Sequence, residues 1–259
     1  MESKNKVFVI SLHDEHKRRR SIAEQLEAQG VGYSFIDALD LRGKKSLSKQ
    51  EYYLESTALD VMGRQLTAGE IGCAVSHRWA YRQVLQDGLN FALILEDDAI
   101  VTGDIKKLFN YLEKVELGWD VIFLGYSKLA PSDAFRFYKM EPIGEPVFFY
   151  LDYKLGRVWR NWTCGTVGYL ISRSGALKLS QASDKVCVVA DGWEFFEKKF
   201  DLKIFHHRPS IVYEDFSSFT SSIQGERAVL LKRERKYLDG VRILRGLFRG
   251  FMIRIRGNK

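Results

Sequence analysis

The sequence is poor in cysteine and proline and lacks a long apolar run near its amino terminus. Its three cysteines, Cys73, Cys164 and Cys187, form no Cys-x-x-Cys pair, so neither a disulfide framework nor a zinc site is indicated. This usage fits a reducing cytoplasm. The apolar run at residues 7–10 is far too short for a signal peptide or a membrane span, so we expect no export by that route.

Nothing in the composition suggests disorder. The chain has four prolines among 259 residues, and 46% of its residues are hydrophobic. This length suffices for one large α/β domain or two small ones.

The positive charge is concentrated in one part of the chain. Residues 227–259 contain eleven Lys or Arg and two acidic residues, a local balance of +9, which leaves −2 for residues 1–226. We therefore divide the chain into a domain at 1–226 and a basic amphipathic C-terminal tail at 227–259.

Strand and helix patterns alternate through the first half of the chain. Apolar runs at residues 6–10, 33–36, 91–95 and 120–124 predict strands, and the segments between them carry helical periodicity. This order predicts an α/β fold with a mostly parallel central sheet. Residues 131–160 read as an irregular, aromatic-rich segment, either a lid that faces the acceptor or ordinary packing under a long loop. A further short strand is predicted at 186–190.

Three carboxylates, Glu96, Asp97 and Asp98, follow the apolar run at 91–95 directly. Their mutual repulsion at the end of a buried strand raises the cost of ionising all three, and a cation would offset that cost. Oxygen ligands favour Mg²⁺ or Mn²⁺, which typically keep positions open for substrate phosphates. The alternative is a solvated acidic turn, and the triplet alone does not decide between the two.

Two other segments carry residues with both a structural and a functional interpretation. The basic cluster at 17–20 follows the first strand and could hold a phosphate, although a solvated helix face explains it as well. Thr67 and Glu70 have the spacing of a capping box at the start of a helix that extends to about residue 88. His77 on that helix reads first as a packed histidine.

The last candidates lie in the second half of the chain. Asp191 follows the run at 186–190, where it either caps a helix together with Glu194 or acts as a catalytic carboxylate. His206 and His207 are adjacent on a predicted strand, so at most one of them faces any given site.

Together these stretches resemble glycosyltransferase family 25, the lipooligosaccharide and lipopolysaccharide galactosyltransferases. The resemblance covers about residues 6–215, and its motifs are individually weak but specific in combination. The matching stretches are residues 9–12 with the arginines at 18–19, then 69–77, 93–98, 165–172 with 175–176, and 190–191.

The resemblance implies a GT-A-like, Rossmann-like nucleotide-sugar fold and an inverting transfer of galactose or glucose from a UDP-sugar. Asp98 would bind Mn²⁺ or Mg²⁺, and Glu96 would be a second metal ligand. Glu96 and Asp97 could each also assist by contacting the metal or the donor's ribose. The residues that would line or shape the donor site are Ser11, Leu12, Arg18, Arg19, Glu70 and His77. Asp191 matches the later acidic motif and is our prediction for the general base on the acceptor hydroxyl.

One departure from the pattern of GT-A enzymes concerns the metal. Many of them supply a late histidine as a ligand, whereas the stretch after Tyr213 begins with Glu214 and Asp215 and contains no histidine. His206 and His207 come earlier in the chain. The sequence therefore identifies no metal ligand beyond the acidic triplet.

The tail repeats apolar residues at helical spacing between Val241 and Ile255, with arginines beside them. This pattern is typical of a helix that lies in an anionic membrane interface. The helix could instead pack on the domain or on a second subunit of a homo-oligomer. Nucleic-acid binding is less well supported, because no reader motif is present.

The expected protein is thus a UDP-hexose-dependent glycosyltransferase, with β-galactosyl transfer favoured, that extends a lipooligosaccharide (lipid A-core) acceptor. We expect it in the cytoplasm, peripheral on the inner membrane face. Two alternatives stay open: a noncatalytic relative that binds sugar or scaffolds an assembly, and a metal-dependent nucleotidyltransferase. The second would release pyrophosphate, whereas a hexosyltransferase would release UDP.

Overall fold

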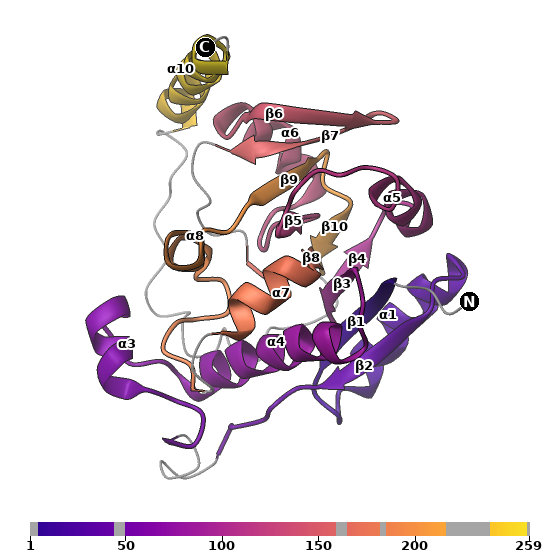
Figure 1. The fold of residues 1–259 in the computed structure, drawn as a ribbon, viewed down its shortest axis with the longest axis vertical. Helices are drawn as coiled ribbons and strands as arrows, with labels where there is room; N and C mark the ends of the chain where they lie inside the picture. Colours follow the sequence, from indigo (N-terminus) through magenta and orange to yellow (C-terminus); the bar gives the residue numbers. More distant parts are fainter. Residues whose placement is uncertain (1–4, 44–49, 159–164, 182–184, 216–238, 258–259) are drawn as a thin grey trace.

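The computed structural model describes residues 5–43, 50–158, 165–181, 185–215 and 239–257. The boundary predicted at 226/227, the tail before residue 239 and Cys164 lie outside these ranges. Within them the chain forms an α/β structure around one large sheet (Figure 1). The strands are β1 (Asn5–Ser11), β2 (Tyr33–Asp37), β3 (Phe91–Glu96), β4 (Ala99–Val101), β5 (Val121–Phe123), β6 (Ile143–Tyr150), β7 (Tyr153–Val158), β8 (Gly168–Ser172), β9 (Ile204–Arg208) and β10 (Val212–Glu214).

The helices follow the strands in the predicted alternation up to β5. They are α1 (His16–Ala28), α3 (Glu55–Met62), α4 (Ala68–Gln86), α5 (Ile105–Leu112), α6 (Pro131–Met140), α7 (Arg173–Ser180), α8 (Trp193–Phe200) and α10 (Asp239–Gly257). Thr67 and Glu70 form the predicted capping box of α4, and the Asp104 side chain accepts the Lys107 N–H at the start of α5. Helix α5 ends at Leu112.

The large sheet has the order β2-β1-β3-β8-β5-β9-β7-β6. Among these described strands six run in one direction, while β8 and β7 run in the other. The sheet is therefore mixed, with most strands in the predicted common direction. Strands β1 and β3 are parallel neighbours, with Ile10 beside Glu96, so both reach the same edge of the sheet.

Alternate residues of the central strands pack into separate cores on the two faces of the sheet. Val7 and Leu93 belong to one core, which α1 and α5 cover. Phe8 and Ile94 belong to the other, which contains residues of α4, α7 and α8. Figure 1 shows these last three helices together on one side of the sheet. The strands are buried on both faces, as continuous apolar runs such as residues 91–95 predict.

Two predictions about local structure are wrong. Residues 131–158 are regular rather than irregular, because α6 is followed by a β6–β7 hairpin that extends the sheet through β9. Phe148 of this segment packs against the core, whereas Phe135 and Phe149 are exposed. Residues 186–190 form no strand beyond an isolated bridge between Val186 and Tyr53, because Val186 and Ala190 pack in a small separate cluster beside α4.

A second, two-stranded sheet lies beside the edge where β3 ends. Strand β4 begins directly after Asp98 and pairs antiparallel with β10, with Ala99 opposite Glu214. A Cβ at Gly125 would collide with the Val212 carbonyl oxygen, so only glycine permits this approach. The small sheet brings residues 212–215 to the acidic triplet from more than 100 positions away in the sequence.

Candidate active site

The candidate site lies where β1 and β3 end side by side. The Ser11 hydroxyl at the end of β1 donates to Asp97 Oδ2 at 2.6 Å. Arg18 in the first turn of α1 bridges two carboxylates, with Nη1 3.0 Å from Asp97 Oδ1 and 3.2 Å from Asp98 Oδ2. The structure thus joins the basic cluster and the acidic triplet. Burial raises the pKa of Asp97, although Ser11 and Arg18 oppose that rise.

Arg19 fixes the loop that follows β1. Its guanidinium donates to the carbonyl oxygens of Ser11 and Leu12 at 3.2 and 3.1 Å, pairs with Asp37 at the end of β2, and lies over the Phe35 ring at 4.6 Å. Arg18 and Arg19 therefore have different positions. Arg18 reaches the carboxylates, whereas Arg19 stabilises the loop that carries Ser11 and Leu12.

Glu96 points toward α4 and β8. Its Oε1 accepts from the Thr166 hydroxyl and lies 3.4 Å from His77 Nε2. His77 Nδ1 lies 2.7 Å from the Tyr169 hydroxyl, so the imidazole connects α4 with Glu96 of β3 and Tyr169 of β8. Burial alone would raise the pKa of Glu96, but the hydrogen bonds and charge of His77, together with Thr166, outweigh it and leave the pKa below its usual value. His77 is a packed histidine, as its spacing predicts, and it holds a site carboxylate.

Asp98 differs from its two neighbours in the way its oxygens are engaged. Its Oδ2 contacts Arg18, while its buried Oδ1 has no hydrogen-bond partner among the described residues. Burial raises the pKa of Asp98 to about 8; the charges of Glu96, Asp97 and Glu214 add to the rise, and Arg18 opposes it. A buried carboxylate oxygen without a donor is costly unless it is protonated or meets a cation. Asp98 therefore fits the part of a metal ligand.

Glu214 is a further carboxylate of this cluster, and sequence reasoning did not assign it a role. It is the last residue of β10, and the adjacent Asp215 N–H donates to the Asp98 carbonyl oxygen at 2.8 Å. Burial raises the pKa of Glu214, the Lys128 N–H opposes the rise, and the charge of Glu96 adds to it. Glu214 thus stands in the stretch where many GT-A enzymes supply a histidine.

Cys73, on α4, lies near Glu96 of the triplet. Single ligand atoms of Cys73, His77 and Glu96 lie within 4.8 Å of one another, a spacing that could hold a metal ion. The pKa of Cys73 is raised well above its usual value by burial and then by the charges of Glu96 and Asp191. Asp191 therefore lies within electrostatic range of the same thiol as Glu96.

The structure also bears on the structural alternatives for Asp191 and Glu70. The N-cap of α8 is Gly192, and Asp191 is the residue directly before it. Glu70 is 4% exposed, and both of its oxygens accept from Arg64 at 2.8 Å in addition to the capping box. The capping box and the Arg64 ion pair therefore give Glu70 a structural role, which is independent of the predicted role in the donor site.

The late histidines lie in the cores on opposite faces of β9, as adjacent strand positions require. His206 Nδ1 lies 2.8 Å from the Tyr126 hydroxyl, whereas His207 Nε2 lies 2.5 Å from Tyr150 and its Nδ1 lies 2.6 Å from the Pro209 carbonyl oxygen. Burial lowers the pKa of His207 to about 4, although the Pro209 carbonyl opposes the fall. Both imidazoles are engaged in these cores, so neither replaces the missing ligand.

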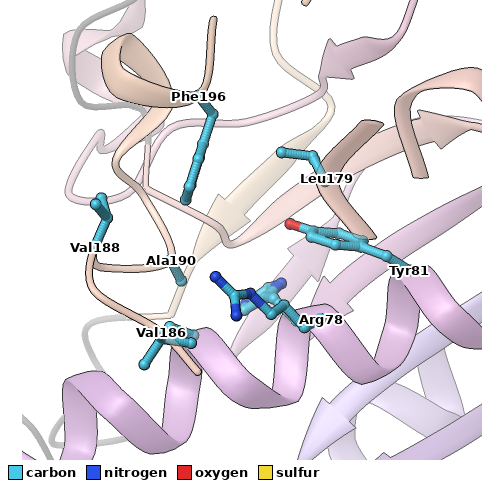
Figure 2. A pocket seen from close by; sticks show the side chains of 9 residues that line it. Arg78, Tyr81, Leu179, Val186, Val188, Ala190 and Phe196 are labelled. Atoms are coloured by element: carbon cyan, nitrogen blue, oxygen red, sulfur yellow. The ribbon is translucent and has the colours of Figure 1, made fainter. Parts of the chain in front are cut away.

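A small cavity lies beside α4, and His77, which contacts Glu96, is one of the residues that line it. Its volume is about 20 Å³, and Figure 2 shows Arg78 and Tyr81 of α4 facing Val188, Ala190 and Phe196 across it. This space holds at most one or two water molecules, so it cannot be the binding site of a nucleotide sugar.

Comparison with known proteins decides the family. Residues 4–193 match the model of glycosyltransferase family 25, described as an LPS biosynthesis protein. The chain belongs to glycosyltransferase family 25. It is 25% identical to human procollagen galactosyltransferase 2 over 233 residues, which are 81% of this chain and 35% of that protein. It is 30% identical to procollagen galactosyltransferase 1-A of Xenopus laevis over 192 residues, 70% of this chain and 29% of that one.

Other relatives in the family have names that indicate no activity. The chain is 28% identical over 187 residues, 68% of its length, to the bovine protein named probable inactive glycosyltransferase 25 family member 3 and spans 28% of that protein. The chain thus spans about a third or less of these relatives. Among solved structures, a mutant of Drosophila galactosyltransferase 7 with manganese, UDP-Gal and xylobiose is similar at TM-score 0.43 and 11% identity, over 90% of this chain and 81% of that one.

Proposed function

We propose that this family 25 member is an inverting hexosyltransferase that moves galactose or glucose from a UDP-sugar to a lipooligosaccharide core. The observation that carries the proposal is the convergence of Ser11, Arg18, Asp97 and Asp98 at the ends of two parallel strands. The carboxyl ends of parallel strands are where α/β folds bind nucleotides. A GT-A-like arrangement with β-galactosyl transfer is the specific form that we infer.

The donor set of the cluster fits Mn²⁺ or Mg²⁺. Asp98 offers an unengaged buried oxygen, and Glu214 and Glu96 contribute to its electrostatic environment, so these carboxylates would hold the ion. When bound, the metal would neutralise negative charge that develops on the leaving diphosphate. Cys73, His77 and Glu96 form the alternative group, but Glu96 Oε1 already accepts from Thr166 and a thiol favours softer ions. We therefore favour the Asp98 side of the cluster.

The chain's own residues supply the remaining requirements of the reaction. Ser11, Leu12 and Arg19 shape the loop that would receive the nucleotide, and Arg18 brings positive charge to the diphosphate. The acceptor oxygen attacks the anomeric carbon, the bond from that carbon to the diphosphate oxygen breaks, and UDP leaves with the electron pair. Asp191 takes the proton from the acceptor hydroxyl. The charge of Asp191 acts on the Cys73 thiol, as does that of Glu96, and this nearness to the cluster supports the role.

The acceptor and location follow from the same proposal. The LPS description of the family supports a lipid A-core acceptor, and we propose a cytoplasmic protein that is peripheral on the inner membrane face. None of the helices in the described ranges is long and apolar enough to cross a membrane.

The test is UDP release from a panel of UDP-sugars, with and without Mn²⁺ and with a lipooligosaccharide acceptor. We expect metal-dependent release from UDP-galactose or UDP-glucose and loss of release in Asp98→Asn. Asp60→Asn, on the exposed side of α3, is the matched control and should behave as the wild type. Release of pyrophosphate from a nucleoside triphosphate would instead identify a nucleotidyltransferase. Donor binding without turnover under all conditions would identify a noncatalytic relative.

A further inference from the structure

Helix α10 is held against the domain by the face that carries Gly246 and Gly250. It lies on α6 and β6 at one end of the molecule (Figure 1). Gly246 is buried there, and a Cβ at this position would collide with the Lys139 carbonyl oxygen. One turn further, Gly250 lies over Pro142, and Arg249 forms an ion pair of 2.9 Å with Glu141. The two glycines therefore let the helix backbone approach α6 closely.

The opposite face of α10 is apolar and exposed. Its residues recur at spacings of three and four positions, so they form one continuous stripe along the helix. The exposed fractions are 67% for Leu244, 59% for Leu247, 64% for Phe248, 60% for Phe251 and 47% for Ile255. A monomeric domain rarely leaves five large apolar side chains together in water, so this stripe is expected to meet a partner.

The surroundings of the stripe are basic. The sequence of α10 contains five arginines and one acidic residue, Asp239, and Arg245 beside the stripe is exposed. Helix α6 exposes Phe135 at 70%, with the Lys139 ammonium 4.3 Å from its ring centroid. Aromatic and aliphatic side chains flanked by cations are typical of a helix that lies in a lipid headgroup layer.

We propose that the exposed stripe of α10, from Leu244 to Ile255, docks the protein on an anionic lipid surface. A helix of 19 residues is about 28 Å long, too polar to span the bilayer but suited to lie flat on it. Anionic headgroups attract the arginines, whereas a second copy of the chain would bring a second set of like charges to the same place. The lipid surface is therefore the occupant that the charge favours. This inference goes beyond sugar transfer and does not depend on it.

The experiment is flotation of the full chain with phosphatidylcholine vesicles, with and without phosphatidylglycerol. We expect binding to the anionic vesicles and a loss of roughly tenfold or more in the partition coefficient of Phe248→Asp/Phe251→Asp. The matched control is Leu59→Asp/Leu177→Asp, which adds the same charge at exposed apolar positions of α3 and α7 and should bind as the wild type. Arg245→Glu should weaken binding to anionic vesicles roughly tenfold and binding to neutral ones little.

Two outcomes would overturn the proposal. Equal loss of binding in both double variants would show that negative charge alone, and not the stripe, controls it. A wild-type dimer that does not bind vesicles and becomes monomeric in Phe248→Asp/Phe251→Asp would assign the stripe to a second copy. Release of UDP measured without vesicles separates these outcomes from failure of the proposed transferase function.

Discussion

Metal binding should be linked to a single proton near neutral pH, because burial raises the pKa of Asp98 to about 8. A divalent ion must displace that proton below pH 8, so the apparent affinity should rise by up to about tenfold per pH unit. Only about 1% of such a group is ionised at pH 6 and about half at pH 8, which predicts a roughly fiftyfold gain between them. Calorimetric titration with Mg²⁺ at pH 6, 7 and 8 measures this gain.

Buffers of different ionisation enthalpy count the protons released in the same titrations. We expect close to one proton per ion at pH 6 and about half at pH 8. Asp98→Asn should bind Mg²⁺ more weakly and lose this dependence, whereas Asp60→Asn should retain both. An affinity that is unchanged between pH 6 and 8, with no proton release, would refute the assignment of Asp98 as a buried ligand that lacks a donor in the metal-free protein.

Three further predictions concern catalysis, stability and docking. Asp191→Asn should retain UDP-sugar binding in calorimetry but transfer at least about a hundredfold more slowly, and near-normal transfer would exclude it as the base. Since His207 is buried neutral with a pKa lowered to about 4 from 6.5, its contribution to stability should be full above pH 6.5 and fall by roughly 3 kcal/mol as pH drops to 4. Urea unfolding should show a flatter pH dependence for His207→Gln than for the wild type, and parallel curves would contradict this. Gly246→Leu should release α10 from α6 and speed its proteolytic removal, whereas Leu247→Ala on the exposed face should not.

Much of the central sheet was predictable from local sequence patterns. The apolar runs at residues 6–10 and 91–95 can be covered on both faces only inside a layered α/β fold, and they form β1 and β3. Because parallel neighbours end at the same edge, Ser11 and Arg18 meet the acidic triplet. The family resemblance selected those same residues. The capping box of α4 was equally readable, since it depends only on Thr67 and Glu70.

The features that sequence did not predict depend on contacts between distant segments. The run at 186–190 has strand-like composition, yet it packs beside α4 and makes only an isolated bridge with Tyr53. The hairpin at 143–158 becomes part of the sheet through its pairing with β9. Periodicity predicted the α10 helix and its apolar stripe, but the docked face is the glycine face. Helix α10 packs on the domain, which was one alternative for the tail. It still exposes its apolar side, the feature on which the membrane alternative was based.

Glu214 illustrates how the site acquires a carboxylate that no local motif announces. Strand β10 has only three residues, so its partner is set by tertiary packing: β4 offers an open edge directly after the triplet, and glycine at 125 lets Val212 approach. Glu214 then comes to the acidic cluster, where its charge contributes to the raised pKa of Asp98. If Glu214 also binds the metal, Glu214→Gln should weaken Mg²⁺ binding while lowering the pKa of Asp98. Unchanged Mg²⁺ affinity of Glu214→Gln between pH 6 and pH 8 would exclude Glu214 as a ligand.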